Sequence, residues 1–307
     1  MGGTGRGSAA AGVGQEKLLP LPLRAVRVRL NRSCRFYSPS QPPPARGGGG
    51  SYVCHIFALA LSLLAILPTT PAHAAGRVVS LNLCTDQMLV LLAPEKIAAL
   101  SDLARDPALS FVAPRAQRFP GVRASAEAVL ALRPDLVLGT RFGAQTTLAM
   151  LERHGVPVLR IDLPSDFPGI ARLTRDTALA LDVPERAEPA IAEMEAILTS
   201  VRPPDRPPSA IAWEPRGYTA GPASPMGAVL RAAGLINAAA GQRLGTEALL
   251  RHPPDLLVVP DTPAFPSLAT DMLAAPALRD IPRRTLPPAL TLCAGPFSAQ
   301  AVALLAR

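Results

Sequence analysis

Two cysteines are the residues of this chain whose type and position most suggest chemistry. Cys84 lies in LNLCTDQ and Cys293 in LTLCAGPF, 209 residues further on. In an oxidising compartment such a pair can form a disulfide. Both can equally be small apolar core residues, or one or both can touch a ligand or its metal. Cys84 could also be a nucleophile, because a helix N-terminus lowers the pKa of a thiol.

The histidines argue against catalysis and against a bare metal site. Beyond residue 75 the chain has only His154 and His252. Both lie at predicted helix ends just before strands, which suits surface histidines better than zinc ligands or a general base for Cys84. We therefore expect a protein that is not an enzyme, with no catalytic residue, no metal site and no intrinsic cofactor.

A short pattern appears twice, 120 positions apart: AEAVLALRPDLVLGT and TEALLRHPPDLLVVP. In each copy a glutamate opens an apolar helical run, a proline ends the run, and an aspartate follows the glutamate by eight residues. The pairs are Glu127 with Asp135 and Glu247 with Asp255. The repeat predicts two lobes of similar build, each presenting an acidic helix start. A cleft between two lobes is a usual place to bind a small molecule.

The net charge of +8 belongs to the first 75 residues, which hold 8 of the 31 basic residues and 1 of the 23 acidic ones. The remainder holds 23 basic and 22 acidic residues, so its balance is only +1. A nearly neutral folded part does not suit nucleic-acid binding.

Residues 51–74 are predicted to be a secretory signal peptide. The apolar run from Ile56 to Leu67 is too short for a comfortable membrane span, and PAHAA provides an A-x-A cleavage site ending at Ala74. A membrane anchor or a buried helix fits less well, because no stop-transfer sequence follows. Residues 1–50 read as a disordered extension or an over-extended gene start. We expect a soluble periplasmic protein after cleavage.

Strands and helices alternate along the rest of the chain, which implies parallel α/β sheets. The predicted strands cover 77–81, 96–100, 136–138, 156–161, 210–213 and 256–259. The fold class is therefore α/β, with an N-terminal lobe at 76–166, a helical linker at 167–202 and a C-terminal lobe at 203–307. Pro184 suits the first turn of the second linker helix, whereas Pro189 lies deep enough to kink it.

An ordered set of segments carries a resemblance to a known family. The segments are RVVSLN, ALRPDLVLGT, HGVPVL, VPERAE, AAGLIN and HPPDLLVV. Together they resemble the helical-backbone periplasmic substrate-binding proteins of ABC importers for iron–siderophore complexes, haem and cobalamin. The resemblance covers residues 77–305 and implies two Rossmann-like α/β lobes bridged by one long helix, with the ligand held between them.

The resemblance also implies a partner. Members of this family dock on a membrane permease dimer through one glutamate of each lobe, and these glutamates match Glu127 and Glu247. The alternative is that each carboxylate only complements the dipole of its helix, which stabilises by about 0.3–1 kcal/mol. We expect a monomer that meets a permease and a small-molecule metal chelate, but no nucleic acid.

The predicted ligand-binding residues lie on loops that the resemblance places at the cleft. They are Cys84, Arg105, Arg141, Trp213, Arg216, Tyr218 and Cys293. Arginine forks suit the oxygens of anionic chelates, and aromatic rings can stack on a planar ligand. The alternative for the arginines is that they are solvated at the surface, and the alternative for the aromatic rings is that they pack against the edge of the sheet.

The arginines favour a ferric siderophore over cobalamin or haem as the cargo. Corrinoid and haem binders line their cleft with aromatics, and only eight aromatic residues follow residue 75. An exported cysteine-dependent enzyme, and a chelate-sensing protein without a transport role, are the remaining hypotheses.

Overall fold

The computed structural model describes residues 76–239, 241–261 and 275–307. All of them belong to one compact unit. The predicted signal peptide and the extension at 1–50 lie outside the described residues. Within the described residues, no helix combines the length and apolarity needed to cross a membrane.

The N-terminal sheet is parallel and has the order β2-β1-β3-β4. Its strands are β1 (Val78–Ser80), β2 (Ile97–Ala99), β3 (Leu136–Thr140) and β4 (Val158–Ile161). Helices α2 (Leu83–Leu92), α3 (Ala113–Ala116), α4 (Ala126–Ala131) and α5 (Gln145–Arg153) connect them, with short 3-10 turns at Pro94–Lys96 and Asp102–Arg105. The two central strands are almost entirely buried, as expected for a parallel sheet covered on both faces.

The C-terminal sheet repeats this order as β7-β5-β8-β9. Its strands are β5 (Ser209–Glu214), β7 (Ile236–Asn237), β8 (Leu256–Pro260) and β9 (Arg283–Leu286), and β6 (Tyr218–Thr219) adds an antiparallel pair at the end of β5. Helices α8 (Pro225–Ala232), α9 (Thr246–Arg251) and α11 (Ala299–Leu305) accompany 3-10 turns at Pro215–Gly217, Pro276–Leu278, Pro288–Leu290 and Pro296–Ser298. Two α/β sheets of matching order confirm the predicted fold class.

The repeated aspartates have the same structural role in both sheets. The Asp135 carboxylate accepts the backbone N–H groups of Gly76 and Arg77 at 3.0 and 2.9 Å, just before β1. The Asp255 carboxylate accepts the N–H and hydroxyl of Ser209 at 2.8 and 2.7 Å, at the start of β5. Each aspartate therefore joins the beginning of one central strand to the beginning of its neighbour.

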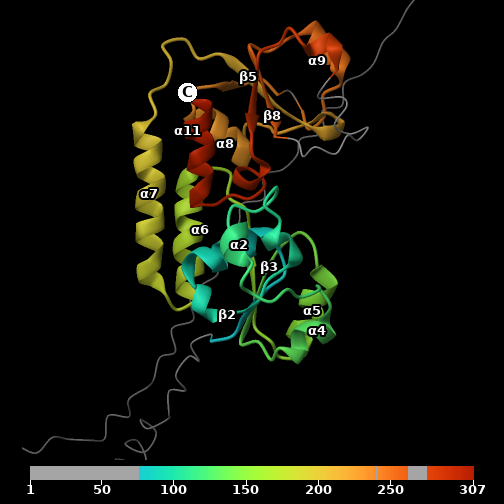
Figure 1. Ribbon diagram of the computed structural model, residues 1–307, viewed down its shortest axis with the longest axis vertical. Helices are drawn as coiled ribbons and strands as arrows, with labels where there is room; N and C mark the ends of the chain where they lie inside the picture. The colour runs from blue at the N-terminus through green and yellow to red at the C-terminus, as the bar shows by residue number, and fades with distance from the viewer. Residues whose placement is uncertain (1–75, 240, 262–274) are drawn as a thin grey trace, which may run out of the picture. The chain divides into compact units, whose positions relative to one another are not determined.

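The linker contains two helices, α6 (Phe167–Ala180) and α7 (Ala187–Ser200), separated by a 3-10 turn at Pro184–Arg186. In Figure 1 they run side by side, and α11 contacts α7. Pro189 lies in the first turn of α7, where its missing N–H has no intrahelical acceptor, so the predicted kink is not needed.

One buried core runs through the chain from the N-terminal sheet to the C-terminal sheet. It contains Val78 and Leu138, then Ile191 and Met194 of α7, and Val302 of α11. The opposite face of each sheet has its own smaller cluster, beneath α4 and α5 or beneath α9. The two lobes are thus joined by shared apolar burial as well as by the chain.

Pro276–Leu278, after the second internal undescribed segment, is a 3-10 turn. The last helix of the chain begins as the 3-10 turn Pro296–Ser298 and continues as α11.

Two helix-ending glycines provide a matched test of the packing. Gly155 after α5 and Gly234 after α8 both have a φ of +78°. A Cβ at Gly155 would meet nothing within 4 Å, whereas a Cβ at Gly234 would lie 2.5 Å from Pro204 and 3.0 Å from Pro203. We predict that Gly155→Ala lowers the free energy of unfolding by about 1–2 kcal/mol, the left-handed penalty alone.

Gly234→Ala should cost about 1–3 kcal/mol more, because Pro203 and Pro204 must also move. Denaturant titration of both variants measures the difference. Equal losses would contradict the close contact between Gly234 and the prolines.

Candidate functional site

A disulfide joins Cys84 to Cys293 and sets the geometry of the candidate site. Cys84 lies in the first turn of α2, directly after β1, and Cys293 lies between β9 and α11. The two Cα atoms are 5.2 Å apart, although 209 residues separate them in sequence. We call the junction of the two lobes around this bond the seam. The structure contains the disulfide, and both cysteines are also buried in the core. Neither sulfur is therefore a free thiolate for metal binding or nucleophilic attack.

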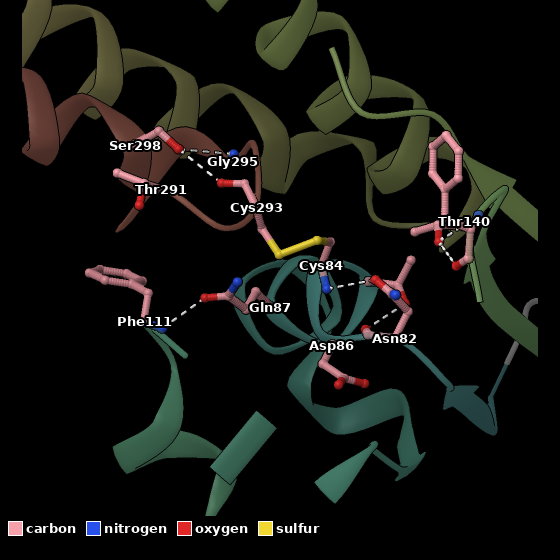
Figure 2. The surroundings of a disulfide bond; sticks show 12 residues. Asn82, Cys84, Asp86, Gln87, Phe111, Thr140, Thr291, Cys293, Gly295 and Ser298 are labelled. Carbon is pink, nitrogen blue, oxygen red and sulfur yellow. Dashed lines mark hydrogen bonds between the residues drawn. A yellow bond between two sulfur atoms is a disulfide. The ribbon is translucent and has the colours of Figure 1, made fainter. Parts of the chain in front are cut away.

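The disulfide is anchored on both sides by local hydrogen bonds (Figure 2). The Asn82 side chain accepts the Cys84 N–H at 2.9 Å and caps α2. The Ser298 hydroxyl donates to the Cys293 carbonyl at 3.1 Å and accepts the Gly295 N–H at 3.3 Å. Each cysteine therefore lies on a backbone that is fixed independently of the bond.

Beside the disulfide, the two lobes are in direct aromatic contact. The rings of Phe111 and Phe297 stack with centroids 5.0 Å apart and planes 14° apart. The Gln87 side-chain oxygen accepts the Phe111 N–H at 2.8 Å, and Gln87 is fully buried. A small cavity of about 60 Å³ next to this stack is lined by both phenylalanines and by Met194 of α7. This side of the seam has no room for a chelate.

Asp86 is a buried acid two residues after Cys84. Its carboxylate accepts the N–H of Ser101 at 3.2 Å and also the Ser101 hydroxyl. Burial raises the pKa of Asp86 to about 7, and the hydrogen bonds from Ser101 and Ser80 offset only part of that effect. In Figure 2 the carboxylate points away from the disulfide, and its hydrogen bonds with Ser101 join α2 to the segment after β2.

Two of the predicted ligand-binding arginines are paired within the N-terminal lobe. Arg141 follows β3 and forms an ion pair with Asp162 at 2.5 Å, and both side chains are well exposed. Arg105 pairs with Asp102 at 2.5 Å and donates to the Phe119 carbonyl at 2.9 Å. A ligand would have to compete with these partners, which weakens the original argument for an anionic chelate.

The sequence predicts Trp213 at the ligand cleft, but the structure buries it in the core. Its side chain is 0% exposed and packs with Ile211 and Leu257 in the second core of the C-terminal lobe. The indole N–H donates to the Leu244 carbonyl at 3.0 Å. Because successive strand residues point to opposite faces, Trp213 shares the inward face of Ile211 and is not available for stacking on a ligand.

Tyr218 and Arg216 remain exposed after β5. The Arg243 guanidinium lies 5.1 Å from the centroid of the Tyr218 ring, and Tyr218 is 48% exposed. The Arg216 side chain has no hydrogen bond or ion pair within the described ranges. Tyr218 also lines an open pocket of about 490 Å³ with the loop that leads to Ser224.

Glu214, the last residue of β5, is a half-buried carboxyl that sequence reasoning missed. Burial raises its pKa, and none of the described residues bonds to its side chain. It is available as a hydrogen-bond acceptor at the same sheet edge as Arg216 and Tyr218.

Four exposed apolar or aromatic side chains follow strands of the two sheets, and of these sequence reasoning selected only Tyr218. Each follows the carboxyl end of a strand, where open α/β sheets bind their ligands. These residues are Leu103 after β2, Phe142 after β3, Tyr218 after β5 and Leu292 after β9. Phe142 is 74% exposed, and its backbone is held by the Thr140 hydroxyl. The loop position that selected Arg141 would have selected Phe142 as well. We call these four residues the apolar rim.

The two repeated glutamates are exposed, as docking requires. Glu127 lies in the first turn of α4, and Glu247 lies in the first turn of α9. Their role as permease contacts remains a prediction.

The described ranges contain no group of three or more His, Cys, Asp or Glu side chains arranged to hold a metal ion. The expectation of no bare-metal site concerns the whole chain, so it stays a prediction.

Residues 78–282 match the sequence model of a family described as periplasmic binding protein. Curated proteins provide a second likeness. A cobalamin-binding protein of Halobacterium salinarum is 30% identical over 146 residues, which cover 43% of this chain. The match spans only 39% of that relative's length.

Solved structures of similar proteins extend the likeness over most of the chain. A periplasmic haem-binding protein of Roseiflexus sp. RS-1, in its apo form, has 26% sequence identity and a TM-score of 0.62, with coverage of 76% of this chain and 98% of that one. A periplasmic haem-binding protein of Pseudomonas aeruginosa has 26% identity and a TM-score of 0.60, with coverage of 76% and 91%. The family is one of binding proteins rather than enzymes.

The raised pKa of Asp86 predicts a pH-dependent stability. The folded state holds the proton more tightly than the unfolded state, whose carboxyl titrates near 3.8. The contribution of Asp86 therefore falls as pH rises from about 4 to about 7 and is constant above that. We expect the difference in unfolding free energy between wild type and Asp86→Asn to change by up to about 4 kcal/mol across this window.

Chemical denaturation of both proteins from pH 4 to 8 gives that difference. Other carboxylates also make stability depend on pH, such as Glu152, whose pKa is lowered by its ion pair with Arg160. Their contribution is the same in both proteins, so it cancels in the difference. A difference that stays constant with pH would contradict a buried, protonated Asp86.

Proposed function

We propose that this chain, which belongs to the periplasmic binding protein family, captures a planar metal–tetrapyrrole and delivers it to the permease of an ABC importer. The cargo is haem or a corrinoid, held at the seam between the lobes. The observation that carries the proposal is the apolar rim, because a flat macrocycle gains most of its binding energy from apolar and aromatic contacts.

The electrostatics of the seam support the same class of ligand. Arg141 and Arg105 are already paired with aspartates, so they add little net positive charge. Arg216 and Arg243 are the exposed cations beside Tyr218, and they can meet the peripheral carboxylates of haem or the amides of a corrinoid. The curated relative with cobalamin in its name and the two haem-binding proteins are consistent with this choice.

A ferric siderophore is the second candidate. The unpaired side chain of Arg216 favours it, because a guanidinium suits the oxygen-rich surface of such a chelate. Both proposals, for a tetrapyrrole and for a siderophore, place the ligand at the seam, but they use different side chains to bind it.

A titration of residues 75–307 tests the ligand class. Hemin, cyanocobalamin and a ferric hydroxamate are added separately, and binding is followed by ligand absorbance and calorimetry. We expect one of the two tetrapyrroles to bind at least about 10-fold more tightly than the hydroxamate, a difference of about 1.4 kcal/mol. Because Trp213 is buried, quenching of its fluorescence would report energy transfer over a distance rather than stacking. Tighter binding of the hydroxamate would replace this proposal with the second candidate.

Phe142→Ala tests whether the apolar rim forms the site. We expect the affinity for the preferred tetrapyrrole to fall about 10-fold, since an aromatic contact contributes roughly 1 kcal/mol beyond its buried area. Leu179→Ala is the matched control, because Leu179 is a similarly exposed apolar residue on α6, at 68% against 74%. Equal affinities of the two variants would exclude Phe142 from the site.

Charge reversal tests delivery separately from capture. The double variant Glu127→Arg/Glu247→Arg should lose most importer-dependent uptake in cells, because each lobe would repel basic groups on the permease. Its ligand affinity should match that of the wild type. Glu193→Arg/Glu195→Arg, at two exposed glutamates on α7, makes the same change in net charge and is the control. Unchanged uptake by the double variant would exclude these docking contacts.

A further inference from the structure

We infer that the Cys84–Cys293 disulfide is a clasp that holds the two lobes at a fixed separation, so that ligand enters and leaves across the apolar rim without separation of the lobes. The inference builds on the proposed ligand site at the seam. It adds the direction of access and the absence of a closing motion.

The disulfide is the covalent member of a set of contacts between the lobes. The Phe111–Phe297 stack is another, and the core through α7 and α11 is a third. Among the described residues, the cavity beside the stack on the Phe111 side of the bond has a volume of about 60 Å³. A cavity of this volume is too small for a ligand of chelate size.

The opposite side of the bond leads to the rim. Figure 2 shows Phe111 on one side of the disulfide and Thr140 on the other. Thr140 ends β3 and holds the backbone of Phe142 through its hydroxyl. Leu292, which is 50% exposed, directly precedes Cys293. The bond therefore stands between a closed, packed part of the seam and the rim with exposed apolar side chains.

The clasp is stiff because neither cysteine lies on a free loop. Cys84 is within the first turn of a ten-residue helix capped by Asn82, and Cys293 is held by Ser298. A hinge movement would have to stretch both anchors as well as the buried bond, whose cysteines are 9% and 2% exposed. With the lobes already positioned, binding loses less conformational entropy, which strengthens affinity through preorganisation.

The test compares wild type with Cys84→Ser/Cys293→Ser by small-angle scattering, amide hydrogen exchange and binding of hemin and cyanocobalamin. In the wild type we expect no change in the radius of gyration on ligand binding. In the variant we expect a larger radius without ligand, a decrease on binding and an affinity about 10-fold weaker. Amides of 83–88 and 291–298 should exchange faster in the variant. Equal affinity, radius and exchange in the two proteins would overturn the clasp.

Reduction provides a second measurement that needs neither ligand nor mutation. Dithiothreitol reduces the bond to two thiols and is itself oxidised to its cyclic disulfide. Ligand-free wild type should then acquire the radius and exchange rates of the variant, while the variant itself should not respond. An unchanged wild type, with both thiols shown free by alkylation, would overturn the clasp. Failure of every chelate to bind would instead reject the proposed function, because the ligand-free measurements still decide the clasp.

Discussion

The Cys84–Cys293 disulfide constrains the distance between the carboxyl-end edges of the two sheets. Cys84 follows β1 and Cys293 follows β9, so the disulfide brings the carboxyl ends of strands from both lobes to a common seam. A parallel sheet exposes the loops that carry its chemistry at this edge. Any site shared by the lobes therefore depends on how the bond, the Phe111–Phe297 stack and α7 together set their separation.

The internal repeat explains why the two edges are so similar. Asp135 and Asp255 fix the amino ends of the central strands through the same type of hydrogen bond. Both sheets then follow the same strand order, and each has an exposed glutamate at the start of the helix before its third strand in that order. The aspartates of the repeat thus align strands, whereas the glutamates are exposed and their role as permease contacts remains a prediction.

The alternation of strands and helices could be predicted because it depends on local periodicity and on turn residues such as Gly155 and Gly234, both of which end helices with positive φ. The site could not be predicted to the same extent. Burial of Trp213 depends on which face of β5 points inward, and that face is set by partners more than 30 residues away. The pairing of Cys84 with Cys293 depends on the spatial distance between their Cα atoms, which cannot be derived from their separation in sequence. The ion pair of Arg141 with Asp162 joins two loops that become neighbours only when β3 and β4 pair.

The same contacts bear on the proposed ligand class. Pairing of Arg141 and Arg105 with aspartates neutralises the charges that would attract a compact anion. Apolar side chains at the ends of strands from both sheets remain exposed, and water is a poor solvent for them. A flat, largely apolar chelate with polar groups at its periphery would cover the rim and leave its edges to Arg216, Arg243 and Glu214. A lobe separation fixed by the disulfide favours such a ligand further, because a rigid macrocycle needs no closing motion to be gripped.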